Sequence, residues 1–553
     1  SDVLKTISYK DDGSVDTIVD RGNLINYTDL GTKQVLKYQV GNETESLQFS
    51  INSMDKLSSI TKNGDTTPLA TFDYEKGGIP KLVRYKNGYS IEMYYDHNRL
   101  SKYMLNNSST QEPLDTYTFD YDANNNITKI YSEKNGTTSY TYDDKLDQLK
   151  KEKLPDGTTI SYEYDEVGNR ISKSITKSGD SKVTQYSYND ANQLIKVGEK
   201  TYQYDKNGNL KNDGSNEYIF NDLNQLEEIK DQTGQTIAKY TYDEEGKRIS
   251  STTGTGTIHY FYDGNQVIYE TNSENQILRE YTYNDAGQPL TMTSNGKTYY
   301  YLYNQHGDVI ALTDDNGKEV ASYTYDAWGN ILTQSGDIAS ENPYRYAGYR
   351  FDENSKLYYL VDRYYNSETA IFLSKDSEEG DVENPISLNG YNYGNNNPVM
   401  MIDPNGHFAF LIPVAYAATI AVLGVGVVYY FIKSLNAVGN LINQSFARVK
   451  SRPKYRSNYE IHHIVAQKAK KAQFARGILK NVGITVNDSI NLISIKTGLH
   501  RRMHTNVYYS TINTLMGNAY NKRNSYSKNH KNVVALLRAV RVWLTAKSIS
   551  SPF

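Results

Sequence analysis

The chain of 553 residues contains no cysteine. This absence excludes disulfide bonds, thiolate chemistry and zinc sites built from cysteine. It leaves the compartment open, because an exported protein of this size can rely on its core and on β-pairing instead of cross-links. A chain this long exceeds one compact core, so two or more domains are expected.

The first residues lack a signal peptide, because SDVLKTISYK has no apolar run. The chain enters a repeating pattern almost at once. We therefore expect it to be the C-terminal part of a longer protein.

Acidic residues are almost missing from residues 448–553, which hold 20 Lys and Arg against two acids, Glu460 and Asp488, for a net charge of +18. Residues 1–447 hold 40 Lys and Arg against 62 Asp and Glu, for a net charge of −22. A solvated lysine surface is the plainer explanation of a basic run. Because this imbalance spans a domain-sized piece, it favours a polyanionic partner for the tail.

Tyrosine, by contrast, is abundant, with 52 residues that mostly fall in one recurring phrase. The second aromatic of the phrase recurs mostly every 20 to 24 residues between Tyr121 and Tyr325. The clearest copies are YTFDYDANNN, YTYDDKLD, YEYDEVGNR, YQYDKNGNL, YTYDEEGKR, YTYNDAGQP and YTYDAWGN.

Each copy predicts a β-hairpin. Tyr-x-Tyr places aromatics on one face of a strand, and the following Asp-x-x-Gly-Asn predicts a turn in which Gly or Asn takes a positive φ. A lone hairpin is marginal in water, so the units must pair into one long sheet. We expect the tyrosines to stack as ladders across the strands.

With these phrases, residues 1–400 resemble the Rhs/YD-repeat family. The resemblance implies a mainly β fold whose hairpin sheet spirals into a hollow shell around a C-terminal cargo. It implies a YD-repeat shell over 1–343 and a closing segment over 344–407, marked by LYYLVDRYYNSETAIFLSKD, LNGYNYGNNNPV and IDPNG. An ordinary β-solenoid or sandwich decorated with tyrosine is the structural alternative.

In that family the closing segment often carries an aspartyl self-cleavage activity. Paired carboxylates suit this chemistry, because one can act as acid while the other acts as base. By motif position the candidates are Asp376, Asp381 and Asp403, with a cut that follows Asp403-Pro404-Asn405-Gly406-His407. Turn aspartates without catalytic role are the alternative for any loop so rich in Asn, Gly and Pro.

Residues 408–432, FAFLIPVAYAATIAVLGVGVVYYFI, form a run of 25 residues without charge. Its length meets the criterion for a transmembrane helix, with Tyr429 and Tyr430 where an interfacial belt would lie. A membrane anchor between shell and cargo has no evident purpose. We therefore expect an apolar helical linker over 408–447 that is sequestered and contacts a membrane only during delivery.

The basic tail holds four of the nine histidines in two pairs. His500 and His504 are four residues apart in a predicted helix, so they share a face and can chelate one ion. His462 and His463 are adjacent, and in the short strand or loop expected there they point to opposite sides. This suggests one metal ligand and one base. Asn491 lies between the pairs, within a second stretch expected to be extended, ITVNDSINLISIK.

The order His-His, Asn, His-x-x-x-His resembles the nucleases of the HNH/endonuclease VII superfamily, especially the AHH-type toxins with a small α+β, ββα-metal core. The resemblance implies that His462, His500 and His504 hold a divalent ion (Zn, Mg, Mn or Ni). His463 would be the general base and Asn491 would orient it. Arg501 and Arg502 are placed to bind phosphate. A structural or surface role is the alternative for any one histidine, and it is kept for His530.

Together these features resemble a polymorphic toxin of the wall-associated WapA type, with a nuclease over 448–553. The resemblance implies a protein that is secreted or held in the cell wall of a Gram-positive bacterium and acts in the target-cell cytoplasm. Nucleic acid is the implied substrate, with tRNA favoured over DNA, and a cognate immunity protein is an implied partner. The alternatives are a surface adhesion or carbohydrate-binding protein and a pore-forming toxin acting through residues 408–432.

Overall fold

The computed structural model describes residues 5–9, 15–30, 33–53, 56–62, 64–75, 80–96, 99–108, 110, 113–244, 246–284, 287–376, 385–404, 406, 410–411, 459–463, 479 and 492–496. The chain divides into two compact units. The larger comprises Asp29–Gly380 and Asn384–Ala418, and the smaller comprises Ser1–Thr28, Asp381–Glu383 and Thr419–Phe553.

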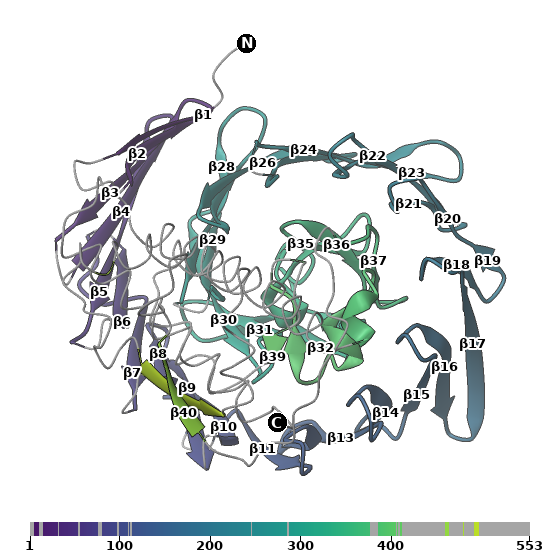
Figure 1. Ribbon diagram of the computed structural model, residues 1–553. Coiled ribbons are helices and arrows are strands. Elements are labelled where there is room, and N and C mark those ends of the chain that lie inside the picture. The colour runs from purple at the N-terminus through teal and green to yellow at the C-terminus, as the bar shows by residue number, and fades with distance from the viewer. Residues whose placement is uncertain are drawn as a thin grey trace. The chain divides into compact units, whose positions relative to one another are not determined.

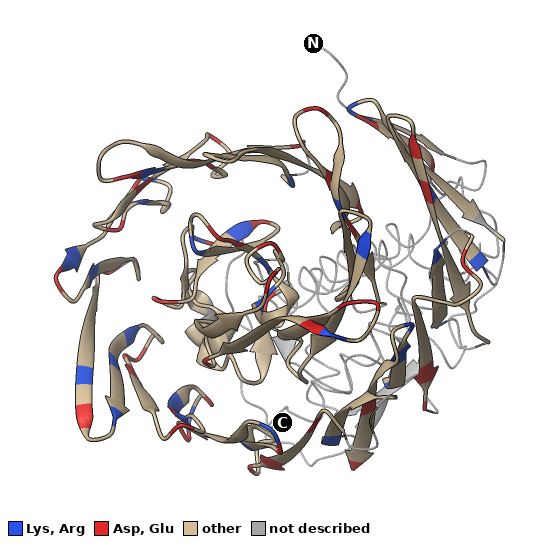
Figure 2. Cartoon of the chain, turned by 180° about the vertical axis from the view of Figure 1, so that it is seen from behind, with Lys and Arg blue, Asp and Glu red and all other residues tan. Residues whose placement is uncertain are grey.

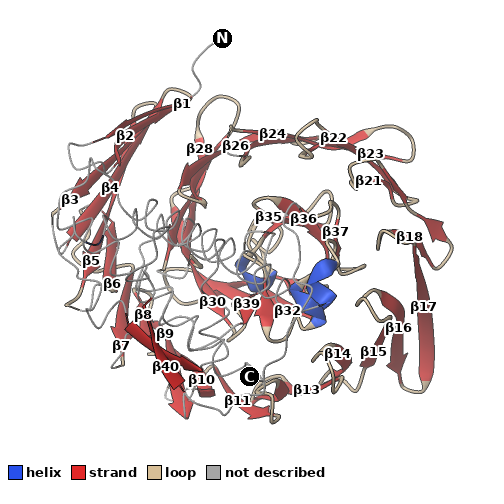
Figure 3. Ribbon diagram, in the orientation of Figure 1, coloured by secondary structure: helices blue, strands red, loops and turns tan. Residues whose placement is uncertain are grey.

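The described chain is built almost entirely of strands, with three short 3-10 helices (Figure 3). In the smaller unit, β1 (Lys5–Tyr9), β2 (Val15–Asp20) and β3 (Asn23–Asp29) pair antiparallel in chain order. The first run of strands in the larger unit is β4 (Lys33–Val40), β5 (Glu43–Ile51), β6 (Leu57–Lys62), β7 (Ala70–Tyr74), β8 (Pro80–Tyr85), β9 (Tyr89–Asp96), β10 (Arg99–Asn107), β11 (Asp115–Tyr121), β12 (Ile127–Ser132), β13 (Gly136–Tyr142), β14 (Leu149–Lys153), β15 (Thr159–Tyr164), β16 (Arg170–Lys177), β17 (Asp180–Tyr188), β18 (Leu194–Val197) and β19 (Lys200–Thr201).

A second run forms a 14-stranded sheet in chain order. It comprises β20 (Gln203–Tyr204), β21 (Leu210–Asn212), β22 (Asn216–Phe220), β23 (Leu226–Asp231), β24 (Thr236–Tyr242), β25 (Arg248–Thr253), β26 (Gly256–Asp263), β27 (Gln266–Thr271), β28 (Ile277–Tyr283), β29 (Pro289–Ser294), β30 (Lys297–Tyr303), β31 (Val309–Thr313), β32 (Glu319–Tyr325) and β33 (Ile331–Ser335). We call β4–β33 the wall.

Each strand of the wall's first run pairs antiparallel with the next, as β15 does with β16 and β16 with β17. In Figure 1 the wall follows a spiral path around β34–β37. Acidic and basic residues are interspersed along it, many of them at turns (Figure 2). The mainly β fold predicted from the repeats is confirmed, as is the spiralling hairpin sheet that the resemblance to YD-repeat proteins implies.

The turns between repeat strands use the aspartate as expected and the asparagine for a further purpose. Oδ1 of Asp165 accepts the N–H groups of Val167 (3.1 Å) and Asn169 (2.8 Å), while Gly168 has a φ of +79°. Nδ2 of Asn169 donates to Asp165 (2.8 Å) and to Asn192 in the following turn (3.1 Å). The final Asn therefore ties neighbouring turns together, as Asn126 and Asn209 also do.

The second tyrosine of the repeat joins successive hairpins through its hydroxyl. Among the described repeats, nine such hydroxyls donate to a backbone carbonyl near the start of an earlier return strand, at 2.5 to 2.9 Å. The donor–acceptor pairs are Tyr74–Leu57, Tyr95–Pro80, Tyr121–Leu100, Tyr142–Ile127, Tyr164–Leu149, Tyr242–Leu226, Tyr262–Arg248, Tyr283–Val267 and Tyr325–Val309.

This ladder of hydroxyl bonds replaces the expected stacking of equivalent rings. Ring contacts in the described part of the chain are mostly edge-to-face or tilted, as for Tyr103 and Tyr117 (6.1 Å, 69°). A strand twist offsets equivalent side chains, whereas a long phenol still reaches the neighbouring carbonyl.

Replacing Tyr164 by phenylalanine is expected to lower the free energy of unfolding by about 1 kcal/mol, the net worth of one internal hydrogen bond. Tyr131→Phe is the matched control, because its hydroxyl contacts an exposed carboxylate, Asp120 (2.7 Å). Urea denaturation of the full chain, followed by tyrosine fluorescence, measures both midpoints. Equal midpoints for the two variants would show that the hydroxyl ladder adds nothing to stability.

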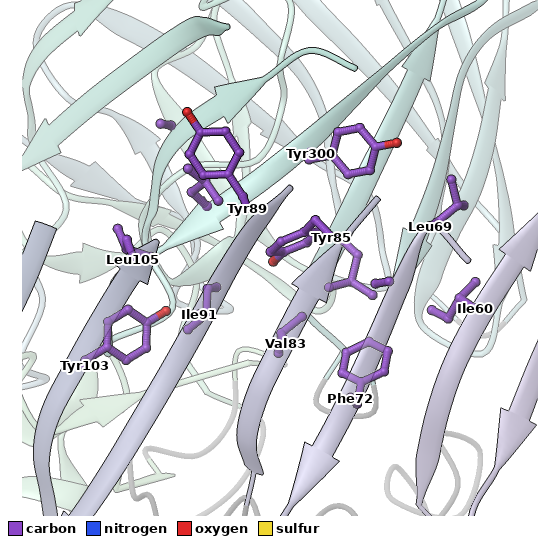
Figure 4. Close-up of a cluster of buried hydrophobic side chains, with 14 of the residues drawn as sticks. Ile60, Leu69, Phe72, Val83, Tyr85, Tyr89, Ile91, Tyr103, Leu105 and Tyr300 are labelled. Carbon is purple, nitrogen blue, oxygen red and sulfur yellow. The ribbon is translucent and has the colours of Figure 1, made fainter. Parts of the chain in front are cut away.

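Two layers of the wall pack against each other where the spiral overlaps. Figure 4 shows Tyr85 and Tyr89, from β8 and β9, facing Tyr300 of β30. Tyr103 in β10 donates to the carbonyl of Tyr303 (2.8 Å), 200 residues away in sequence. Apolar burial between layers is the main stabilising term in such a core, and here it holds the early repeats against the late ones.

Residues 344–376 and 385–404, here called the inner segment, lie within the curve of the wall (Figure 1). They contain η1 (Tyr346–Gly348), β34 (Arg350–Asp352), β35 (Leu357–Leu360), β36 (Arg363–Asn366), β37 (Ile371–Phe372), η2 (Pro385–Leu388), η3 (Gly394–Asn396) and β38 (Met401–Ile402), which pairs with β39 (Phe410–Leu411). Trp328 of the wall packs with Tyr346, Tyr358 and Phe372 in one buried cluster.

The asparagine-rich part of the inner segment binds the turns of the wall. Nδ2 of Asn396 donates to the carbonyl of Gly168 (2.7 Å), and Nδ2 of Asn397 donates to Asn126 (3.0 Å). Nε2 of His306 lies 2.9 Å from the carbonyl oxygen of Pro398. Polar side chains thus anchor the inner segment to repeats that are far apart in sequence.

Glu152 in β14 is a fully buried acid that joins this strand to the turn at Ala327, 175 residues later in the chain. Both its carboxylate oxygens accept the N–H of Ala327 (3.0 and 3.1 Å). Burial, and then the nearby charge of Asp326, raise the pKa of Glu152 from 4.5 to about 8. Lys173, 4.0 Å from Asp326, partly offsets the negative charge.

Stability is therefore expected to fall as pH rises from about 5 to 8. In this window folded Glu152 keeps its proton while the unfolded chain releases it, which removes up to about 1.4 kcal/mol per pH unit. Glu152→Gln should flatten this slope, and the exposed Glu163→Gln serves as control. Urea midpoints at several pH values measure the slope of stability against pH. An unchanged slope in Glu152→Gln would show that Glu152 is not the group responsible.

Within the residues that the structure describes, no helix combines the length and the apolar character needed to cross a membrane. The predicted apolar helix at 408–447 lies outside the described residues, apart from β39.

Candidate functional site

Two of the three aspartates predicted for self-cleavage meet at one buried arginine. Nη2 of Arg363, at the start of β36, lies 2.7 Å from Oδ2 of Asp376 and 3.6 Å from Oδ2 of Asp403. The side chains are 5%, 11% and 3% exposed, respectively. Burial lowers the pKa of the Arg363 guanidinium, whereas the two carboxylates act to raise it.

The same arginine holds the loop that contains the predicted cut. Its Nε donates to the carbonyl of Gly406, and its Nη1 donates to the carbonyl of Gly390 (2.9 Å). Gly406 has a φ of +80°, and a Cβ there would meet the carbonyl oxygen of Leu360 at 3.0 Å and the backbone nitrogen of Arg363 at 3.1 Å. Only glycine fits this close approach.

Asp403 is fixed from both sides. Its backbone N–H donates to the hydroxyl of Tyr349 (2.7 Å), and its Oδ1 accepts the N–H of Gly406 (2.9 Å). The second bond closes the Asp403–Gly406 turn one residue before His407. Asp403 therefore stabilises a turn, which was the alternative to a catalytic role. Its other carboxylate oxygen, Oδ2, faces Arg363.

This arrangement can support acid–base chemistry on a nearby peptide. Carboxylates can polarise water, and a fixed guanidinium can stabilise charge on a carbonyl oxygen. Arg363 was not predicted from the sequence. The DRYYN phrase carries no chemical signal, because arginine also stands next to tyrosine at Arg345 and Arg350. Asp381 lies outside the described residues.

In the smaller unit, β40 (Tyr459–His463) carries the adjacent histidines and pairs antiparallel with β41 (Leu492–Lys496). The register places His462 opposite Ile493 and His463 opposite Leu492. Strand structure over 459–463 and 492–496 agrees with the strand or loop predicted for the first stretch and the extended backbone predicted for the second, and the rest of both stretches lies outside the described residues. Asn491, the residue predicted to orient the base, comes directly before Leu492 in the chain, and Leu492 is the strand partner of His463.

The remaining predicted residues of the tail, Asn491, His500, Arg501, Arg502 and His504, lie outside the described residues, as do the predicted helices apart from Leu479. Across the ranges that the structure describes, no cluster of three or more His, Asp or Glu is arranged to hold a metal ion. The proposed ligand set therefore stays a prediction.

Residues 99–399, more than half of the chain, match the family model of the Teneurin YD-shell. The chain belongs to the Teneurin YD-shell family. Residues 443–542 match a second model, a nuclease family of the HNH/ENDO VII superfamily with conserved AHH. Both resemblances predicted from sequence are thus confirmed. In this YD-shell chain Ile461 precedes the histidine pair where the AHH motif has alanine.

Relatives with known names include the tRNA3(Ser)-specific nuclease WapA of Bacillus spizizenii and the tRNA nuclease WapA of Bacillus subtilis. Each is 39% identical over 368 residues, which is 58% of this chain. The YD-shell chain spans 16% of the length of either relative.

Among solved structures, TcdB2-TccC3-Cdc42 has a TM-score of 0.57 at 16% identity, over 76% of this chain and 26% of that one. At this identity the likeness shows the shell fold alone.

Proposed function

We propose that this chain is part of a contact-delivered interbacterial toxin whose YD shell encloses a nuclease in residues 448–553. The observation that carries the proposal is the match of residues 443–542 to the AHH nucleases. The net charge of +18 over 448–553 fits a phosphodiester substrate, because basic residues supply most of the affinity for a nucleic-acid backbone.

The strand pair supports a ββα-type core for the tail. β40 and β41 are antiparallel, and residues 498–516, where a helix is predicted as the third element, follow β41 in sequence. Successive residues of a strand face opposite sides, so a pair at the end of β40 suits two different tasks.

Imidazole donors fit a divalent ion, and His462, His500 and His504 are the residues that would hold it. When bound, the ion would stabilise negative charge on the scissile phosphate and its leaving oxygen. His463 would take a proton from water or from a ribose 2′-hydroxyl, with Asn491 orienting it. Arg501 and Arg502 would bind flanking phosphates.

The test is incubation of purified residues 443–553 with total tRNA and with plasmid DNA, each with and without a chelator. Degradation of tRNA would identify tRNA as the substrate, in agreement with the names of the WapA relatives. Degradation of plasmid alone would identify a DNase, and loss of either activity with chelator would establish the metal. No degradation of either substrate would refute the nuclease proposal.

Delivery and partners follow from the same proposal. The protein would be secreted or wall-associated in a Gram-positive bacterium, with its nuclease acting in the target-cell cytoplasm and a cognate immunity protein protecting the producer. The division into 1–343, 344–407, 408–447 and 448–553, and any membrane contact of 408–432, belong to this proposal. Co-expression of a neighbouring small gene product that restores growth would test the immunity partner.

We further propose that the inner segment cuts the chain after His407. The contacts of Asp376 and Asp403 with Arg363, beside the Gly406 carbonyl, support this reaction. One carboxyl would act as acid and the other as base on a water that attacks the peptide carbonyl. The products are a new carboxylate at residue 407 and a new amine at residue 408.

A further inference from the structure

Arg170 stands apart from the other buried arginines of the described chain. The remaining four, Arg248, Arg345, Arg350 and Arg363, each contact a carboxylate. Arg170, at the start of β16, is only 4% exposed, yet Nε, Nη1 and Nη2 all lack a hydrogen-bond partner. Leaving a buried cation without compensation is strongly unfavourable.

The groups nearest to Arg170 are aromatic. Its guanidinium carbon lies 4.7 Å from the ring centre of Tyr162 and 4.2 Å from that of Trp328. Ring faces attract a cation, but they carry no net charge. These contacts explain why Arg170 tolerates burial. The guanidinium also interacts with the phenols of Tyr164 and Tyr186, short of full hydrogen-bond geometry, but neither phenol brings a negative charge.

The neighbouring phenols do not supply a counter-charge. Burial raises the pKa of Tyr162, Tyr164 and Tyr186 above the usual value. Arg170 acts in the opposite direction on all three, but burial outweighs it. The phenols therefore stay protonated and neutral at physiological pH.

Arg170 lines a small cavity between the wall and the inner segment that is rich in hydrogen-bond donors. Tyr188, Thr369 and Asn392 also line it, and Oη of Tyr188, Oγ1 of Thr369 and Nδ2 of Asn392 each lack a hydrogen-bond partner. Oδ1 of Asn392 already accepts the N–H of Asn396 (3.2 Å), which leaves its NH2 group as the free end of the amide. No Asp or Glu lines the cavity in this described region.

The chemistry of this lining selects its guest. The free space accommodates a guest about the size of one water molecule. Water could bond to all of these groups, because the hydroxyls of Tyr188 and Thr369 can accept as well as donate, but water carries no charge to compensate the buried guanidinium. A monatomic anion accepts from every side and also compensates the guanidinium charge.

We propose that Arg170, Tyr188, Thr369 and Asn392 form a binding site for a halide, which is chloride under physiological conditions. The site connects β16 and the turns of the wall to residues 369–371 and 389–396 of the inner segment. A ligand that binds only the folded state stabilises it by mass action. Chloride therefore strengthens the attachment of the inner segment to the wall.

The first test is thermal unfolding of the full chain in sodium chloride and in sodium gluconate at equal ionic strength. The midpoint rises with chloride in a saturable way, and gluconate, which is too large for the cavity, gives no such rise. Arg170→Gln abolishes the chloride-specific rise. Arg99→Gln retains it, because Arg99 is an exposed arginine that also lies over a ring, that of Tyr121 (5.3 Å).

The second test keeps the proposal open to refutation even if Arg170→Gln does not fold. Crystals of the wild-type chain in bromide at physiological halide concentration are measured for anomalous scattering. A peak at the Arg170 nitrogens supports the site. A map without that peak overturns it, as does an equal effect of chloride and gluconate on the wild-type midpoint. A chloride-specific rise that persists in a folded Arg170→Gln also overturns it.

Discussion

His463→Ala is expected to lower the rate of nucleic-acid cleavage by the tail about 10²–10⁴-fold, the usual contribution of a general base. The histidine ends β40, and its strand partner Leu492 directly follows Asn491 in the chain. In cells the same change should turn a lethal tail into a tolerated one. Single-turnover cleavage of the substrate and growth after induction measure the two effects.

His530→Ala is the control for His463→Ala, because it also removes one imidazole from the basic tail but lies outside the predicted set. It should cut and kill like the parent. A chelator should abolish cleavage if metal is essential, whereas His463→Ala should leave metal affinity unchanged. Wild-type rates in His463→Ala would reject its role as base, even if the tail proves to be a nuclease.

Asp403→Asn is expected to leave the chain in one piece, where the parent separates into residues 1–407 and 408–553. Asparagine keeps an oxygen that can accept the N–H of Gly406, so the turn should survive. What it removes is the charge beside Arg363. Gel electrophoresis of freshly purified protein and mass determination of the small fragment measure the outcome.

Asp362→Asn is the matched control for Asp403→Asn, because Asp362 is exposed and precedes Arg363 in the chain. Cleavage in this variant should proceed as in the parent. Asp376→Asn should block it as Asp403→Asn does, since both carboxylates contact the same nitrogen. Normal cleavage in both Asp376→Asn and Asp403→Asn would assign these residues to structure alone.

The sequence predicted the repeat hairpins well because their signals are local. Tyr-x-Tyr alternation and the Asp-to-Gly spacing determine one strand and one turn without reference to distant residues. The bond from the hydroxyl of Tyr164 to the carbonyl of Leu149 follows the same repeat. It was missed because periodicity reports which face a side chain occupies, not what its polar end reaches.

The cluster at Arg363 was only half predictable for a different reason. Asp376 and Asp403 stand in recognisable phrases. Arg363 acquires its role only on folding, which buries it against these two aspartates, 13 and 40 residues later in the chain. Arg170 is a similar case. Nothing in RISKSI distinguishes it, and only the absence of a carboxylate among its folded neighbours does.

The ladder of tyrosine hydroxyls makes the length of the wall adjustable. Every such bond joins a hairpin to the one before it, so its geometry depends only on immediate neighbours. A whole repeat could be gained or lost by recombination without disturbing the hydroxyl bonds of the others, as in arrays whose stability sums over adjacent units. The same locality predicts that a pulling force will open hairpins one at a time wherever no second layer of the wall and no part of the inner segment packs on them.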